Sequence, residues 1–119
     1  MYFLVHLAEA SRKKNRTRTA KSVKSVAGMM EDILGCKWSL TVLGLIRRGV
    51  HRPGAMEHAV EGLSAKVLNE RLRKLVRYGI AAKRVFAEVP PRVEYRLTAF
   101  GARFGTVLDE IEKLERSAN

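Results

Sequence analysis

Apolar residues recur at steps of three and four positions through most of the chain after Ser25, which is the period of one face of an α-helix. The first run stops at Gly35, a common helix terminator, and consists of Val26, Met29, Met30, Ile33 and Leu34. A second run begins at about Trp38 and ends at Arg47-Arg48-Gly49. Because this second helix is apolar on nearly every side, we expect it at the centre of the core.

Two further helices are predicted by residues that favour helix ends. Pro53 suits the first position of a short helix over about residues 53–60. Ser64 is a good N-cap for a helix over residues 65–78, and Gly79 follows its end. Together they predict a short helix followed by a longer one.

A β-hairpin is predicted next, and residues 88–101 are its most informative part. A strand-like stretch over residues 82–87 precedes them. Pro90-Pro91 removes two amide donors, so the tip of the hairpin cannot be regular sheet. The pattern then alternates, with Val93, Tyr95 and Leu97 on one face and Arg92, Glu94 and Arg96 on the other, which is typical of a half-buried strand.

Thr98 is the expected N-cap of a last helix over about residues 99–116. Its apolar stripe is interrupted early by Gly101 and Gly105 and consists of Phe104, Val107, Leu108, Ile111 and Leu114. The predicted fold is therefore mainly α with a small β-hairpin, in the order of a winged helix-turn-helix.

The 119 residues suffice for one compact domain, and the hydrophobic fraction of 46% supports a core. The net charge of +11 indicates a polyanionic partner, either nucleic acid or an anionic membrane surface. Residues 1–24 contain seven basic residues and one acidic residue, so this segment alone supplies more than half of the net positive charge. We therefore expect a flexible basic arm over residues 1–24 and the winged-helix domain over residues 25–116.

The exposed face of the fourth predicted helix carries the candidate chemistry. Leu68, Leu72 and Leu75 form its core stripe, and the opposite side presents Lys66, Asn69, Glu70, Arg73 and Arg77. A helix-turn-helix presents its second helix to the DNA major groove in this way. Lysine and arginine donate hydrogen bonds to guanine, and asparagine pairs with adenine, so this face suits direct recognition of bases. A merely solvated basic face is the alternative.

Three segments resemble the HxlR-type winged helix-turn-helix regulators of bacteria, in the family's order and spacing over about residues 25–114. They are Leu34-Gly35-Cys36-Lys37-Trp38, the stretch over residues 63–68 continuing to residues 72–75, and residues 88–101. The resemblance implies a double-stranded-DNA-binding transcription regulator. It also implies a homodimer formed through the first and last helices.

Three departures from the family pattern stand out. Cys36 occupies the second position of a pair that is often Gly-Gly in the family. Ser25 stands where electrophile-sensing members place a cysteine. No aromatic residue follows Arg52, where Pro53 and Met56 lie instead.

The remaining candidate DNA contacts lie at the helix start and on the wing. Ser64 can cap the fourth helix or offer its hydroxyl to a phosphate. Lys83, Arg84 and Arg92 on the hairpin are expected at phosphates or in the minor groove. The competing hypotheses are a winged-helix protein-interaction module without sequence-specific DNA binding, and membrane attachment through residues 1–24.

Other chemistry has little support in the sequence. Cys36 is the only cysteine; it is a possible redox site near a helix start beside Lys37, although a buried thiol is the commoner case. His6, His51 and His58 do not have metal-ligand spacing. We expect no catalytic residues, metal or cofactor. With no signal peptide or membrane span, the expected location is the cytoplasm, and the effector stays open.

Overall fold

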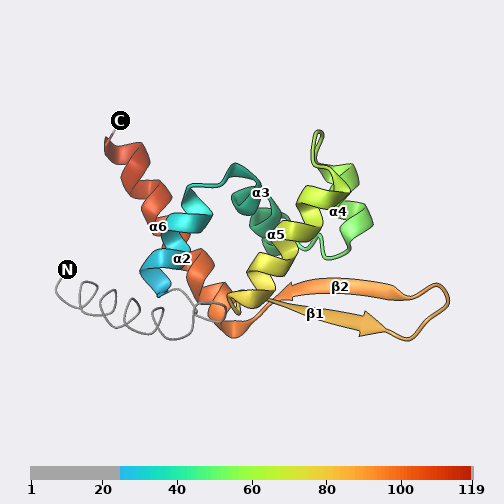
Figure 1. Ribbon diagram of the computed structural model, residues 1–119. Helices are drawn as coiled ribbons and strands as arrows, with labels where there is room; N and C mark the ends of the chain where they lie inside the picture. The colour runs from blue at the N-terminus through green and yellow to red at the C-terminus, as the bar shows by residue number, and fades with distance from the viewer. Residues whose placement is uncertain (1–24, 119) are drawn as a thin grey trace, which may run out of the picture. The chain divides into compact units, whose positions relative to one another are not determined.

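The computed structural model describes residues 25–118, so the predicted basic arm lies outside the described residues. The elements are α2 (Val26–Leu34), α3 (Lys37–Arg47), α4 (Pro53–Ala59), α5 (Ala65–Arg77), β1 (Ala81–Phe86), β2 (Arg92–Leu97) and α6 (Ala99–Ala118) (Figure 1). This order confirms the predicted fold class of a mainly α protein with a small hairpin. The predicted boundaries differ from the observed ones by one or two residues. The chain divides after Gly35 into two compact units.

Helix α2 belongs to the first unit. The Ser25 hydroxyl caps its start by accepting a hydrogen bond from the Gly28 amide at 3.1 Å, and the Gly35 amide donates to the Glu31 carbonyl at its end. Met29 and Ile33 are buried within the single chain, whereas Val26 is 48% exposed.

Helix α3 supplies the centre of the second unit's core, as its apolar sequence predicts. Four of its large apolar side chains are buried, and Ser39 is buried among them. The core is completed from the other elements by Met56, Leu63, Leu68, Leu72, Leu75, Tyr78, Ile80, Ala81, Tyr95, Phe104 and Leu108. Met56 is fully buried, so α4 packs on the core without the aromatic residue that the family pattern favours.

Four chain segments meet at one joint: the end of α5, the start of β1, the end of β2 and the start of α6. Gly79 lies just past the end of α5 and has a φ of 75°. Glycine adopts this positive φ readily because it has no Cβ that would clash with the backbone. The carbonyl of the following Ile80 accepts a hydrogen bond from the Thr98 amide at 3.0 Å, and the Thr98 hydroxyl donates to the Gly79 carbonyl at 2.5 Å. The same hydroxyl accepts from the Gly101 amide at 2.9 Å, which confirms Thr98 as the N-cap of α6.

The wing is a two-stranded antiparallel hairpin that extends away from the helices of its unit (Figure 1). Pairing runs from Ala81 opposite Leu97 to Phe86 opposite Arg92, so residues 87–91 form the tip, as the proline pair predicts. The Tyr95 amide donates to the His51 carbonyl at 2.8 Å. This bond fastens the inner half of the wing to the segment between α3 and α4.

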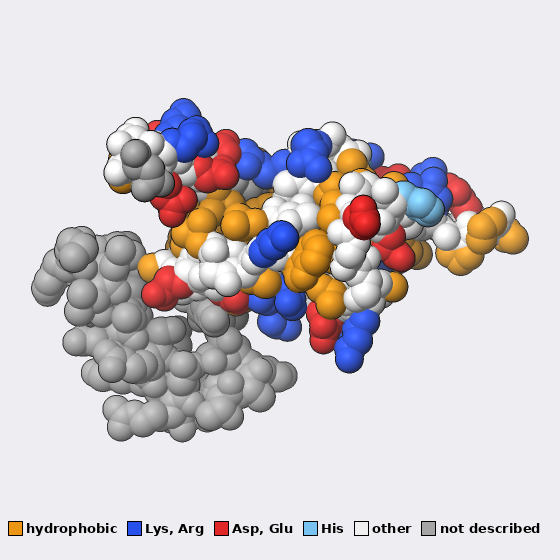
Figure 2. Space-filling model, turned by 90° about the horizontal axis from the view of Figure 1, so that it is seen from above, with side chains coloured by type: hydrophobic (Ala, Val, Ile, Leu, Met, Phe, Trp, Pro, Cys, Tyr) orange, Lys and Arg blue, Asp and Glu red, His pale blue; other side chains and the backbone are white. Residues whose placement is uncertain are grey.

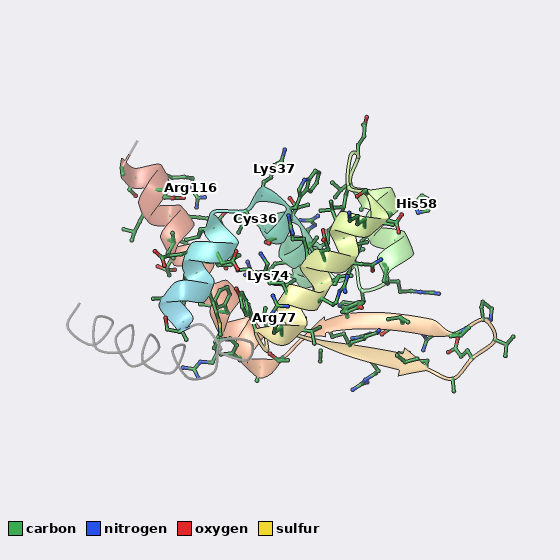
Figure 3. The ribbon with its side chains drawn as sticks, in the orientation of Figure 1. Cys36, Lys37, His58, Lys74, Arg77 and Arg116 are labelled. Atoms are coloured by element: carbon green, nitrogen blue, oxygen red, sulfur yellow. The ribbon has the colours of Figure 1, made fainter. Side chains whose placement is uncertain are left out.

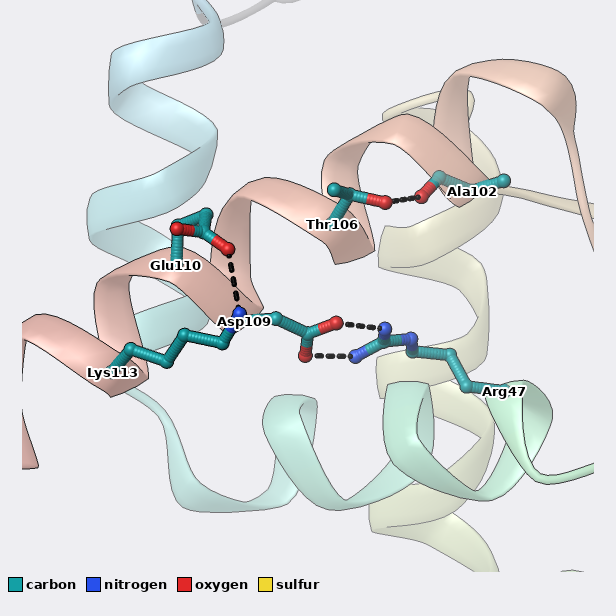
Figure 4. Close-up of polar contacts among 6 residues, drawn as sticks. All are labelled: Arg47, Ala102, Thr106, Asp109, Glu110 and Lys113. Carbon is teal, nitrogen blue, oxygen red and sulfur yellow. Dashed lines mark hydrogen bonds and ion pairs between the residues drawn. The ribbon is translucent and has the colours of Figure 1, made fainter.

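A second tie joins α3 to α6. The Arg47 guanidinium donates two hydrogen bonds to the Asp109 carboxylate, at 3.0 and 2.7 Å (Figure 4). This pairing holds the pKa of Asp109 below its usual value. Gly105 lies beneath the arginine, and a Cβ there would come within 2.8 Å of Nε. The glycines that interrupt the apolar stripe of α6 are therefore positions of close approach.

We predict that Gly101→Ala lowers the free energy of unfolding by about 3 kcal/mol, in the upper part of the usual range for overpacking. A Cβ at this position would overlap the backbone carbonyl of Ile80, which cannot move without disturbing the joint. Urea denaturation of the wild type and the variant measures the change.

Gly54→Ala is the matched control. Position 54 lies in α4 with no neighbouring atom within 4 Å of a new Cβ, so alanine should raise stability by about 0.5–1 kcal/mol. Equal stability of Gly101→Ala and the wild type would contradict the packing role of Gly101.

Candidate nucleic-acid interface

Helix α5 presents one buried and one exposed face. Leu68, Leu72 and Leu75 are fully buried, which fixes the rotation of the helix about its axis. As a result, four of the predicted contact residues are exposed on one side: Lys66, Asn69, Arg73 and Arg77. They span the helix from its first turn to its last, so the structure brings them together as one surface.

Ser64 has a local structural role at the start of this surface. Its hydroxyl accepts a hydrogen bond from the Val67 amide at 3.1 Å, so the residue caps α5. The residue is exposed, and its hydroxyl hydrogen remains available as a donor. The cap and the predicted phosphate contact are thus compatible.

Arg71 and Lys74 form a second basic row on α5 that was not among the predicted contacts. Both are half-buried, because they lie between the leucine stripe and the exposed face. Arg71 Nε is buried without a hydrogen-bond partner within residues 25–118. With Glu70, Arg73 and Arg77 the two residues line a shallow depression of about 310 Å³. The signal in the sequence was the close spacing of the basic residues Arg71, Arg73 and Lys74.

The wing divides its predicted contacts between two faces. Arg84 lies opposite Glu94 and Lys83 opposite Tyr95, and side chains alternate along a strand. Lys83 and Arg84 are both exposed, but they point to opposite faces of the hairpin. A DNA strand that runs along one face of the wing can therefore contact either Lys83 or Arg84 through its phosphates, and not both.

Arg92 is engaged within the wing itself. Its guanidinium forms ion pairs with Glu88 at 3.2 Å and with Glu94 at 3.4 Å, and it lies 4.1 Å from the centroid of the Phe86 ring. Glu94 also pairs with Arg96 at 3.1 Å. The structure thus places Arg92 where its charge is compensated, and its predicted contact with DNA has less support than that of Arg84.

The surface of the wing tip is apolar. Val89 is completely exposed and Val85 is 61% exposed. Figure 2 shows a group of hydrophobic side chains at the far right, where the hairpin ends. The tip therefore offers hydrophobic contact.

Cys36 is half-buried at the N-cap of α3. Burial raises the pKa of its thiol, but the neighbouring Ser39 and the positive charges of Arg71 and Lys74 lower the pKa by more, so the net pKa lies below its ordinary value. Lys37, expected to supply this charge, instead places its ammonium group 5.5 Å from the Trp38 ring (Figure 3). The charges that act on Cys36 therefore come from Arg71 and Lys74 of α5. The redox role of Cys36 stays a prediction.

Residues 25–118 contain no cluster of three or more potential metal ligands. Within them, His58 lies against the Gly54 carbonyl at 2.7 Å, and His51 contributes its backbone carbonyl to the wing. No helix in this part of the chain combines the length and apolar character needed to cross a bilayer.

We predict that Cys36 is alkylated by iodoacetamide with a pH midpoint below that of free cysteine, because the thiolate is the nucleophile and its charge is stabilised by α5. Lys74→Met should move the midpoint to higher pH by removing one of the two charges. Lys37→Met is the control and should leave it unchanged. Equal midpoints for all three proteins would show that α5 does not influence the thiol.

The comparisons with known proteins agree with this arrangement. The model of the HxlR-like helix-turn-helix family matches residues 33–118. The chain is 45% identical over 83 residues to the uncharacterised HTH-type transcriptional regulator sll1512 of Synechocystis sp., a match that covers 70% of this chain and 62% of that protein. It is 37% identical over 82 residues to YvaP of Bacillus subtilis, also named an HTH-type transcriptional regulator, covering 69% and 76% of the two chains.

A solved structure of similar fold is described as a MarR-family transcriptional regulator from Enterococcus faecalis. Its TM-score is 0.69 at 28% identity, and the match covers 76% of this chain and 83% of that chain. The matched family and relatives are regulators of transcription and not enzymes. Because the family model matches well over half of the sequence, the chain belongs to the HxlR-like helix-turn-helix family.

Proposed function

We propose that the chain is a transcriptional regulator that binds a specific sequence of double-stranded DNA as a homodimer in the cytoplasm. The observation that carries this proposal is the exposed face of α5, where Lys66, Asn69, Arg73 and Arg77 form one polar and basic surface on a helix held by its leucine stripe. Long donors on a rigid helix suit the base edges of the major groove.

The wing supports a different kind of contact. Arg84 is exposed on the face of the hairpin that also carries Glu94 and Arg96, and unlike Arg96 it forms no ion pair within residues 25–118. Cations at the flank of a recognition helix contact phosphates without distinguishing bases. We infer that the wing adds affinity and orientation, whereas α5 adds specificity.

The homodimer is inferred from the apolar surface of α6. Val107 is 49% and Leu114 is 70% exposed, and both lie on the side of α6 that also carries the half-buried Ile111. Val26 on α2 is exposed as well. A two-fold dimer that buries these residues would place its two α5 helices about 34 Å apart, one turn of DNA.

We predict that Asn69→Ala or Arg73→Ala weakens binding to the cognate operator by roughly 1–3 kcal/mol and changes binding to random duplex little. The operator is first obtained by mapping the protein on its own genome. Arg84→Ala should weaken binding to both duplexes by similar factors and reduce the salt dependence, because it removes a phosphate contact. Titrations on both duplexes at several salt concentrations provide the measurement.

Arg116→Ala serves as a control, since this exposed residue lies in the last turn of α6. It should bind both duplexes as the wild type does. Equal losses on both duplexes for Asn69→Ala and Arg73→Ala would mean that α5 does not recognise bases. A wild-type protein without salt-dependent binding to any duplex would favour a protein-interaction module.

We predict that Val107→Asp converts the dimer to a monomer at micromolar concentration, because a carboxylate in an apolar interface loses its hydration without gaining a partner. Sedimentation velocity measures the change, and operator binding should weaken in parallel. Thr106→Asp introduces the same charge on another side of α6 and should leave the dimer intact (Figure 4). A wild-type monomer, or dissociation of both variants alike, would contradict this interface.

A further inference from the structure

Glu70 is the one acidic residue of α5, and it lies in the middle of the basic face. It follows Lys66 by one helical turn and precedes Arg73 and Lys74 by one turn, and its side chain is exposed. A surface that only bound phosphates would gain affinity from any neutral residue at this position, because the carboxylate repels the DNA backbone. The negative charge therefore needs its own explanation.

Pairing with a neighbouring cation does not provide that explanation. Residues three and four positions apart on a helix commonly form ion pairs worth about 0.2–0.5 kcal/mol. Within residues 25–118, Glu94 pairs with two arginines of the wing and Glu110 with Lys113 at 2.9 Å. Glu70 has cations at both spacings yet forms no ion pair in this part of the chain. Its carboxylate keeps its full capacity to accept hydrogen bonds.

The surroundings of Glu70 restrict what it can accept from. The carboxylate shares its shallow depression with Arg71, Arg73, Lys74 and Arg77. These cations draw a polyanion toward the surface, and in the bound state the carboxylate gains a hydrogen bond from the polyanion only where the polyanion presents a donor. In the major groove, the donors are the amino groups of cytosine and adenine, and glutamate is suited to the N4 amino group of cytosine.

We propose that Glu70 determines specificity by accepting a hydrogen bond from the N4 amino group of a cytosine in the major groove, and that its charge weakens binding to sites lacking that cytosine. The inference rests on the proposed function, since it assigns one base contact to the DNA-facing side of α5. It makes two separate statements, one on base preference and one on binding to random DNA.

The two statements are tested with the full chain and two variants, Glu70→Ala and Glu70→Gln. Each protein selects its preferred sequences from a randomised duplex library at one fixed salt concentration, and its affinity for a random duplex is titrated. The wild type should require cytosine at one position of each half-site, by a factor on the order of ten. Glu70→Ala should lose that preference, and Glu70→Gln should shift it toward adenine, which glutamine pairs with through N6 and N7.

Both variants should bind random duplex several times more tightly than the wild type. Glu115→Gln is the charge-matched control, because it removes an exposed carboxylate from α6 and should change neither quantity. Tighter random binding with an unchanged base preference would reduce Glu70 to an electrostatic role and overturn the inference, as would unchanged values of both. If the wild type enriched no sequence at all, the proposed function itself would fail.

Discussion

The Ile80 carbonyl is the point on which the geometry of the second unit depends. It accepts a hydrogen bond from the Thr98 amide, and it lies directly under Gly101, where any side chain would overlap it. Ile80 follows the end of α5, Thr98 follows the end of β2, and Gly101 lies in the first turn of α6. One buried peptide group thus fixes α5, the wing and α6 relative to one another.

This joint has consequences for how charge is used on the surface. A wing held by Ile80 at its base and by His51 along β2 cannot pivot freely about α5. Its own arginines are partly neutralised, since Glu88 and Glu94 pair with Arg92 and Arg96. The exposed cations of α5 therefore differ from Arg92 and Arg96, whose charges are partly neutralised within the wing, and the proposed division between base contacts by the helix and backbone contacts by the wing rests on this difference.

The sequence predicted most of the fold because its local signals agree with one another. Ser64 and Thr98 cap helices as predicted, and the leucine spacing of α5 fixed its exposed face. The pairing of Arg92 could not be predicted, because it depends on the turn that brings Glu88 beside it and on the strand register that sets it over Phe86. The charges around Cys36 likewise come from a helix distant in sequence and not from Lys37, its neighbour.

The glycines of α6 have a role that the sequence pattern could not show. In a helical stripe, Gly101 and Gly105 look like weak positions, since glycine costs about 1 kcal/mol relative to alanine. In the structure, each glycine leaves room for a group from another part of the chain. The Ile80 carbonyl packs against Gly101, and the Arg47 side chain packs against Gly105 and hydrogen-bonds to Asp109. The helix loses intrinsic stability and gains two fixed attachments to other elements of its unit. A dimer formed through the exposed apolar side of α6 would therefore set the spacing of the two α5 helices through rigid contacts.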